Sequence, residues 1–331
     1  MQNTAPELEL DAYLRLNRAS LSEWLAAIRE LSGCGDMNCT VFEGGGQQVG
    51  ALSMLASERG RLICLYASQG MDITGCRATA PVLLLPRTGI PQIARREGPW
   101  QCLTGLVLAR PEDRFRLRLP RGARVLIVRP VTEIPDPLTG GSPGDCLSAW
   151  EDMITCYLHR SPFFRDHAHA IETTDELFRC LTAPNERSVH ACQCPKLDRR
   201  LLRAIEKIRQ EPGWDFNLQD LASHSGVSER NLYYLMKRET GMTPYRLYQR
   251  NRLMRVRQRL VDCQCDVPHI SWYAADAGFS HLGRFAALYR EHFGELPSET
   301  VQWRRNLQDQ WAGAELPSVP EPLPYSSVAE P

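Results

Sequence analysis

The sequence predicts an α+β multidomain protein with a β-rich, antiparallel N-terminal domain, a helical connector and an all-α C-terminal domain. Three observations support this prediction. Short apolar or alternating runs, interrupted by Gly and Pro, fill about 39–130 and are typical of strands. Apolar residues then recur at helical spacing from about residue 146. A pattern of small, apolar and capping residues finally occurs twice within residues 221–297.

The N-terminal region begins with one predicted helix and continues with strands. The helix spans about Ser20–Leu31, where Ser20 or Ser22 can cap it and Trp24 lies on its apolar stripe. In Arg114–Leu119, three apolar residues alternate with three arginines, which is the period of a half-buried strand. The other predicted strands are Leu62–Tyr66, Val82–Leu85, Leu103–Ala109 and Ala123–Val128.

Two helices are predicted after a turn-rich stretch at 134–144. They span about Cys146–His159 and Pro162–Leu181, and the first places Trp150, Ile154 and Tyr157 on one stripe. Residues 183–195 have the composition of a linker, and the proline-rich, acidic end of the chain predicts disorder. We therefore expect a sensor or dimerisation domain at 1–135, a connector at 136–195, a helical domain at 196–306 and a disordered tail at 307–331.

Composition and charge point to a globular protein with one basic module. The chain is 43% hydrophobic and 24% charged, and it contains neither an apolar run of about 18 residues nor a secretory signal. We expect a cytoplasmic protein without a membrane partner, and interpret most of the 12 cysteines as buried hydrophobes. Residues 196–305 hold 19 Lys and Arg against 13 Asp and Glu, a net charge of +6 that suits a polyanion.

The C-terminal repeat predicts two helix-turn-helix units. Leu221–Ser228 aligns with Tyr273–Ser280, 52 positions later, and Gly241–Pro244 aligns with Gly294–Pro297, 53 positions later. In each unit a Gly suits a turn with positive φ, a Ser can cap the second helix, and a Gly-x-x-Pro sequence ends it. Two copies in register make an ordinary helical surface a poor explanation.

The second helix of each unit separates into an apolar face and a face that can contact DNA. Leu232, Leu235 and Met236 form the core stripe of the first, while Phe285 and Tyr289 belong to that of the second. Arg and His can bond guanine, Tyr can bond phosphates or base edges, and small residues permit close approach to the groove. The candidate DNA-binding residues are Glu229, Arg230, Tyr233, Tyr234, Lys237, His281, Gly283, Arg284 and Ala287.

A single helix is predicted between the two units, over Pro244–Asp262. Its 19 residues correspond to about 28 Å, a length that can separate two recognition helices by about one turn of DNA, roughly 34 Å. Some of its arginines are candidates for phosphate contacts, although solvated side chains are an equal alternative for most. These arginines are Arg246, Arg250, Arg252, Arg255, Arg257 and Arg259.

Residues 201–305 resemble the AraC/XylS family of transcription regulators. The first unit shares the positions of Leu221, Ala222, Gly226, Ser228, Leu232 and Gly241. The second shares Ala277–Ser280, Phe285, Tyr289, Arg290 and Phe293–Ser298, and its Gly278–Phe285 stretch resembles the XylS-type branch. The resemblance implies double-stranded DNA and RNA polymerase as partners, activation of transcription, and an N-terminal effector domain that is often cupin-like. Tyr233, Tyr234 and Ala287 depart from the family's usual residues, which bears on the DNA target.

Enzyme chemistry is not indicated by the sequence, and we predict no catalytic, metal or cofactor site. The strand-rich segment lacks the His-x-His pattern of a metal-binding cupin. Two interpretations are open for four further residues: they line an anion pocket, or they are core aromatics and surface arginines. These residues are Trp100, Tyr66, Arg87 and Arg110. The Cys-x-Cys pairs Cys192/Cys194 and Cys263/Cys265 are too sparse to define a zinc site or a redox switch.

The leading hypothesis is a sequence-specific DNA-binding activator that reads two successive major grooves and responds to a small effector. An alternative is an effector-independent regulator whose N-terminal domain forms a homodimer or binds a protein partner. An enzyme fused to a DNA-binding domain is a further alternative, which would require a pocket with a base and a nucleophile.

Overall fold

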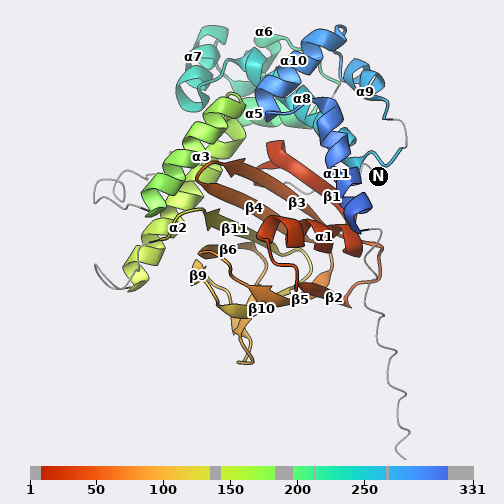
Figure 1. Cartoon of the computed structure of the whole chain (residues 1–331). Coiled ribbons are helices and arrows are strands. Elements are labelled where there is room, and N and C mark those ends of the chain that lie inside the picture. Colours follow the sequence, from red (N-terminus) through yellow and green to blue (C-terminus); the bar gives the residue numbers. More distant parts are fainter. Residues whose placement is uncertain (1–8, 135–142, 183–196, 212, 266–267, 312–331) are drawn as a thin grey trace, which may run out of the picture.

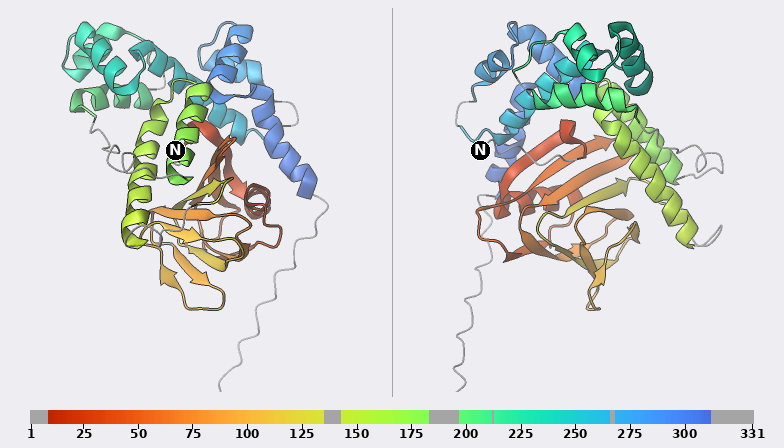
Figure 2. Two further views of the ribbon diagram at one scale, coloured as in Figure 1. Left: turned by 60° about the vertical axis from the view of Figure 1, so that its left-hand side comes forward. Right: turned by 180° about the vertical axis from the view of Figure 1, so that it is seen from behind.

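The computed structural model describes residues 9–134, 143–182, 197–211, 213–265 and 268–311. In Figures 1 and 2 the β-sheets lie at one end of the molecule and helices α5 to α10 at the other. The long helices α2 and α3 run alongside the sheets and reach toward the helical end. The predicted α+β class is therefore confirmed. The predicted domain divisions at 135/136 and 195/196 involve residues outside these ranges, and they stay predictions.

Two antiparallel sheets form the N-terminal domain. Within the described residues, one sheet has the strand order β1-β3-β4-β11-β6-β9 and the other β2-β5-β10-β7-β8. The strands are β1 (Leu14–Ser20), β2 (Asn38–Glu43), β3 (Gln48–Ser57), β4 (Gly60–Ala67), β5 (Gly70–Arg77), β6 (Val82–Thr88), β7 (Gln92–Arg95), β8 (Gln101–Cys102), β9 (Val107–Ala109), β10 (Arg114–Leu119) and β11 (Arg124–Pro130).

The six-stranded sheet is buried on both faces, which explains its continuous apolar runs. In β4, Ile63 and Leu65 belong to the apolar core shared with the five-stranded sheet, whereas Leu62 and Cys64 belong to the core shared with α2 and α3. Successive side chains point to opposite faces of a strand, so both faces need apolar residues. The predicted strand at 103–109 is shorter than expected, because the Glu151 carboxylate accepts the Leu106 amide hydrogen bond at 3.0 Å.

Helix α1 (Leu21–Ser32) and the second connector helix begin at capping side chains. Helix α1 starts with Ser20, one of the two serines predicted as its cap, in a capping box with Glu23. In the connector, α2 (Pro143–Arg160) is followed by η2 (Ser161–Phe163) and α3 (His167–Thr182). Helix α3 starts five residues later than predicted, because the Asp166 carboxylate accepts the His169 amide hydrogen bond at 2.8 Å and so caps the helix there.

The C-terminal region is helical throughout its described part. Its helices are α5 (Arg199–Gln210), α6 (Leu218–Ser225), α7 (Glu229–Thr240), α8 (Pro244–Asp262), α9 (Ile270–Asp276), α10 (Leu282–Phe293) and α11 (Pro297–Trp311), with the predicted single helix observed as α8. Helix α11 extends five residues past the predicted start of the tail at 307, because Leu307 is buried in the core between the two sheets. No helix in the described ranges is both long and apolar enough to cross a membrane.

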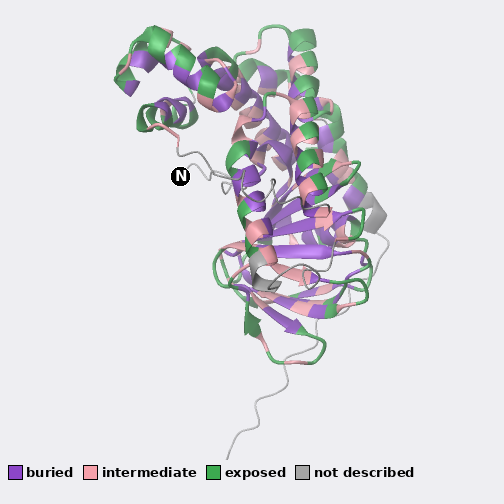
Figure 3. Ribbon diagram, turned by 90° about the vertical axis from the view of Figure 1, so that its left-hand side faces the viewer, coloured by how far each residue is buried: buried purple, intermediate pink, exposed green. Residues whose placement is uncertain are grey.

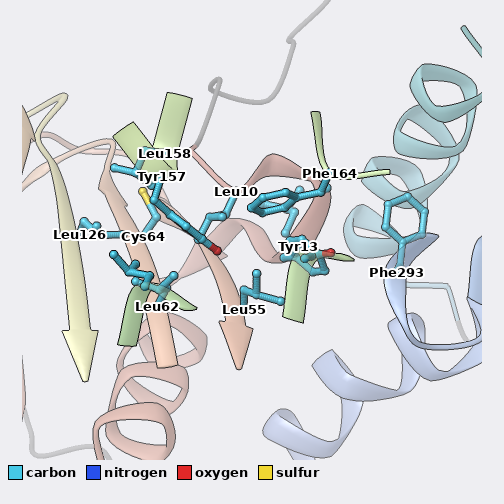
Figure 4. Packing of buried hydrophobic residues seen from close by; sticks show 14 of the residues in the cluster. Leu10, Tyr13, Leu55, Leu62, Cys64, Leu126, Tyr157, Leu158, Phe164 and Phe293 are labelled. Carbon is cyan, nitrogen blue, oxygen red and sulfur yellow. The ribbon is translucent and has the colours of Figure 1, made fainter. Parts of the chain in front are cut away.

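The two C-terminal units are anchored in different cores. Helices α5, α6 and α7 and the first turns of α8 enclose an apolar cluster of their own. The second unit shares its cluster with the connector and the six-stranded sheet. In Figure 4, Leu62 of the sheet, Tyr157 of α2 and Phe293 of α10 all belong to this shared cluster. The second unit is therefore continuous with the main body, and the first forms a separate lobe.

Strand β1 was not among the strands predicted from the sequence. It connects the six-stranded sheet to the second unit through polar contacts. Arg257 of α8 forms an ion pair with Glu295 at 2.8 Å and donates to the Leu14 carbonyl at 3.1 Å. Arg15 of β1 also pairs with Glu295. Asn17 of the same strand donates to the Asp262 carboxylate at 2.9 Å. We call Arg15, Arg257 and Glu295 the β1–α8 cluster.

A second buried ion pair joins α1 to α11. Arg304 donates from Nε and Nη2 to the two carboxylate oxygens of Glu23, at 2.8 and 3.0 Å. Burial tends to raise the pKa of Glu23, but hydrogen bonds from Arg304 and Ser20 outweigh it and lower the pKa to about 2, from 4.5. A carboxylate that is more acidic in the folded state stabilises that state above its unfolded pKa.

The Glu23–Arg304 pair predicts a pH-dependent stability. Its contribution should be complete above about pH 4.5 and should disappear as the pH falls toward 2, by about 3 kcal/mol. We expect the free energy of unfolding, measured in urea, to differ between the natural chain and Glu23→Gln by an amount that shrinks between pH 5 and 3. A difference that stays constant over this interval would contradict the prediction.

Candidate nucleic-acid interface

The first helix-turn-helix unit consists of α6 and α7. Asn217 caps α6 by accepting the Asp220 amide hydrogen bond at 3.0 Å, and Gly226 ends it with a φ of 72°. This left-handed conformation costs Gly little, as predicted for the turn. The Ser228 hydroxyl then accepts the Asn231 amide hydrogen bond at 3.3 Å and caps α7. The turn glycine and the capping serine predicted for this unit therefore have the expected roles in the structure.

Helix α7 buries one face and exposes the other. Leu232 and Met236 are fully buried and Leu235 is 8% exposed, as the spacing predicted. The five candidate residues lie on the opposite side and are all exposed. Figure 3 shows exposed (green) and buried (purple) stretches alternating along the helices of the molecule. We call them the α7 face: Glu229, Arg230, Tyr233, Tyr234 and Lys237.

The α7 face combines cations with aromatic rings. The Arg230 guanidinium lies 5.7 Å from the ring centre of Tyr234, and the rings of Tyr233 and Tyr234 meet edge to face at 6.0 Å. Tyr234 is 59% exposed, so the stacked side chains project from the helix into solvent. In the described part of the chain, Lys237 forms no ion pair with a carboxylate. Guanidinium, ammonium and phenol groups are donors that suit base edges and phosphates.

The second unit consists of α9 and α10. Its turn residue Gly278 has a φ of 80°, and Phe285 and Tyr289 are buried, as predicted. Helix α10 begins at Leu282 with His281 at the N-cap position, whereas Ser280 was expected to cap it. The Ser280 prediction is wrong because the chain stays outside the helix through His281, whose backbone is extended. Arg284 consequently lies in the first turn of α10, where recognition helices commonly contact bases.

The exposed side of α10 holds the other four candidates. They are all solvent-exposed, and we call them the α10 face: His281, Gly283, Arg284 and Ala287. A Cβ atom added at Gly283 would meet open space, so this position leaves room at the helix surface. In the described residues Arg284 has no carboxylate partner. The structure thus places the nine predicted residues on two separate exposed helix faces.

Arg252 of α8 fixes the turn of the second unit. Its Nε donates to the Ala277 carbonyl, and its guanidinium lies 4.6 Å from the ring centre of Phe279. A Cβ atom at Gly278 would lie 2.3 Å from an Arg252 nitrogen. The positive φ therefore favours Gly at 278, and a Cβ atom there would also require the end of the Arg252 side chain to shift. The sequence indicated only the first of these reasons.

The arginines of α8 serve mainly the fold. Arg250 and Arg257 are 3% and 1% exposed, so the expectation of phosphate contacts or solvated side chains is wrong for these two. They are buried because α8 lies between the N-terminal domain and both units. Arg259 pairs with Asp276 and stacks on Trp272, and Arg255 is half-buried. Arg246 is exposed, with a carboxylate of α10 at 3.2 Å.

The other chemical candidates do not assemble into a site. Trp100 stacks with Arg116 and Arg118, and Arg87 pairs with Glu9 at 2.6 Å, so both of these side chains already contact other side chains. Cys192 and Cys194 lie outside the described residues. Cys263 is buried and Cys265 is exposed, and neither forms a disulfide within the described residues. In the described part of the chain, no three His, Cys, Asp or Glu side chains are grouped as metal ligands.

Comparison with known proteins places the C-terminal part among helix-turn-helix domains. Residues 221–303 match the family described as "Helix-turn-helix domain". The XylDLEGF operon transcriptional activator 3 of Pseudomonas putida is 34% identical over 44% of this chain and 42% of its own length. The transcriptional activator RhaS of Klebsiella pneumoniae is 27% identical over 41% of this chain and 48% of its own length. The chain thus spans under half the length of these curated relatives.

The chain is also similar in sequence to a solved structure. An AraC-type transcriptional regulator from Chromobacterium violaceum is 31% identical, covering 32% of this chain and 91% of that chain, with a TM-score of 0.29.

Two units of helix, glycine turn and helix, joined by α8, define a protein with a double helix-turn-helix DNA-binding domain. By its sequence relatives, this chain belongs to the AraC/XylS family of transcriptional regulators. The family resemblance found in the sequence is therefore confirmed.

Proposed function

We propose that this protein is a sequence-specific transcription regulator that inserts α7 and α10 into two successive major grooves of DNA. The observation that carries the proposal is the pair of exposed faces, each on the second helix of its unit and each opposite a buried apolar stripe. The charge of residues 196–305 supports it, because basic side chains favour a phosphate backbone.

The connecting helix supports the binding of one chain to two grooves. Helix α8 has 19 residues and spans about 28 Å, close to the roughly 34 Å of one helical turn of DNA. Its ends contact both units, through Tyr248 in the first and Arg259 in the second. A rigid spacer of this length fixes the separation of the two recognition helices and therefore selects the spacing of the two base sequences.

The curated relatives are named as activators, and we extend this role to the present chain. Activation requires RNA polymerase as a second partner. We therefore also propose that the protein is located in the cytoplasm, together with the DNA. We propose no enzymatic step. A small effector, which the family resemblance implies, and a homodimer complete the proposal.

The proposal is tested by footprinting on the promoters that flank the protein's own gene. At a fixed salt concentration of about 0.15 M, we expect two protected segments about one helical turn apart on the same face of the duplex. Random DNA of equal length is the control, because phosphate contacts alone give salt-dependent binding to any sequence. Equal affinity for the promoters and for random DNA would overturn the proposal.

A further inference from the structure

Leu282, the first residue of α10, is an exposed apolar side chain that was not among the predicted DNA-binding residues. Its side chain is 49% exposed, whereas Phe285 and Tyr289, three and seven positions later, are buried. Residues at this spacing share one face of a helix, so Leu282 extends the apolar stripe of α10 by one turn. Leu282 itself lies outside the apolar clusters that the described residues form.

The backbone that carries Leu282 is supported on two sides. The Phe279 ring lies 5.1 Å from the Phe285 ring, and the Arg252 guanidinium lies 4.6 Å from the centre of Phe279. Arg252 also donates a hydrogen bond to the Ala277 carbonyl. These contacts hold the segment between the turn and the start of α10. A side chain presented on a fixed backbone loses less conformational entropy when it forms a contact.

The neighbours of Leu282 suit close approach to a base pair. Gly283 has no side chain, and a Cβ atom there would meet open space. Arg284 is exposed in the same turn and can bond guanine. Recognition helices contact base edges with their N-terminal residues, and the major groove presents one apolar group, the C5-methyl of thymine. The first turn of α10 thus places an uncovered apolar side chain where that methyl group would be met.

We propose that Leu282 contacts the methyl group of a thymine in the major groove and is a further specificity-determining residue of this protein. The proposal rests on the proposed function, because it requires α10 to enter the groove. The contact removes the methyl group and part of the leucine side chain from water. Burial of one methyl group corresponds to about a fourfold difference in affinity, so we expect a total effect of about three- to tenfold.

The first unit has a different residue at the corresponding position. Glu229 lies three positions before the buried Leu232, as Leu282 lies three positions before Phe285. A carboxylate can accept a hydrogen bond from cytosine but offers a methyl group no apolar contact. The contact between leucine and thymine is therefore expected in only one of the two DNA segments that the protein protects.

The test replaces single thymines of the footprinted promoter by deoxyuridine, which lacks only the 5-methyl group. Binding of the full-length protein is measured by fluorescence anisotropy at a constant salt concentration of about 0.15 M. For one thymine in one protected segment, we expect loss of the methyl group to weaken binding by about three- to tenfold.

Three variants assign this effect to a residue. Leu282→Ala should weaken binding to the unmodified promoter by the same factor and should no longer respond to that deoxyuridine, and alanine favours the helix. Leu282→Met keeps an apolar side chain and should retain both the affinity and the response, within about twofold. Leu202→Ala shortens a leucine of similar exposure, 46%, on α5 and should also retain both.

The outcomes separate this inference from the proposed function. Promoter binding by Leu282→Ala as tight as that of the natural chain would overturn the inference. An undiminished response of Leu282→Ala to every deoxyuridine would also overturn it, as would equal losses on promoter and random DNA. These results leave the proposed function intact as long as the natural chain prefers the promoter. If the natural chain does not distinguish the promoter from random DNA, the proposed function fails and the role of Leu282 fails with it.

Discussion

Replacing Arg230 and Arg284 together by alanine is expected to weaken binding to the specific DNA site by about 2–6 kcal/mol, at least about thirtyfold. Each arginine is exposed on a different recognition helix, and a bidentate contact to guanine contributes about 1–3 kcal/mol of discrimination. The two residues belong to separate units, so their effects should be nearly additive. Titration of labelled promoter DNA, measured by fluorescence anisotropy at constant salt, checks both single variants and the double variant.

The matched control is Arg121→Ala, which removes the same charge from an exposed turn of the N-terminal domain. It should change the affinity for DNA very little. If the double variant loses equal free energy on specific and random DNA, the two arginines contact phosphate and do not read bases. If it binds the promoter as the natural protein does, the α7 and α10 faces are not the recognition surfaces.

Replacing Arg257 by methionine is expected to reduce the free energy of unfolding by about 3–5 kcal/mol. The side chain is 1% exposed, pairs with Glu295 at 2.8 Å and donates to the Leu14 carbonyl at 3.1 Å. Methionine keeps much of the apolar length of the arginine side chain. It leaves Arg15 as the only cation that still pairs with the largely buried Glu295 carboxylate in the described residues. Removing one partner of a buried ion pair is costly because the other charge is left incompletely compensated.

Urea unfolding of Arg257→Met measures this loss, with Arg246→Met as the exposed control on the same helix. The control should stay within about 0.5 kcal/mol of the natural chain. Adding Glu295→Gln to Arg257→Met should recover part of the loss, because it removes the uncompensated carboxylate. A loss for Arg257→Met no larger than that of the control would show that the β1–α8 cluster contributes little to stability.

Local signals were read correctly where local physics decides the structure. Gly226 and Gly278 have the positive φ that the turns require, and α8 has the predicted bounds. The buried and exposed faces of α7 and α10 follow from helical periodicity alone. Every predicted DNA-binding residue is exposed for this reason, although exposure by itself does not establish a contact with DNA.

Nonlocal contacts were not predicted. Strand β1 contains Arg15 and Asn17, and nothing in its sequence indicates that their partners lie more than 240 positions away. The arginines of α8 illustrate the same limit. Arg246 is exposed, Arg252 donates a hydrogen bond to the turn of the second unit, and Arg257 forms a buried ion pair. Their roles depend on which elements pack around α8, and a single sequence does not state this.

The sequence by itself therefore determined the class of this protein, its two recognition helices and the length of the helix between them, because caps, glycine turns and periodicity act over a few residues. Only the tertiary structure decided that the second unit joins the main core while the first keeps its own, and that Leu282 stays exposed at the start of α10. Both depend on the burial of charges and apolar surface from distant segments, and that burial arises only when the chain is folded.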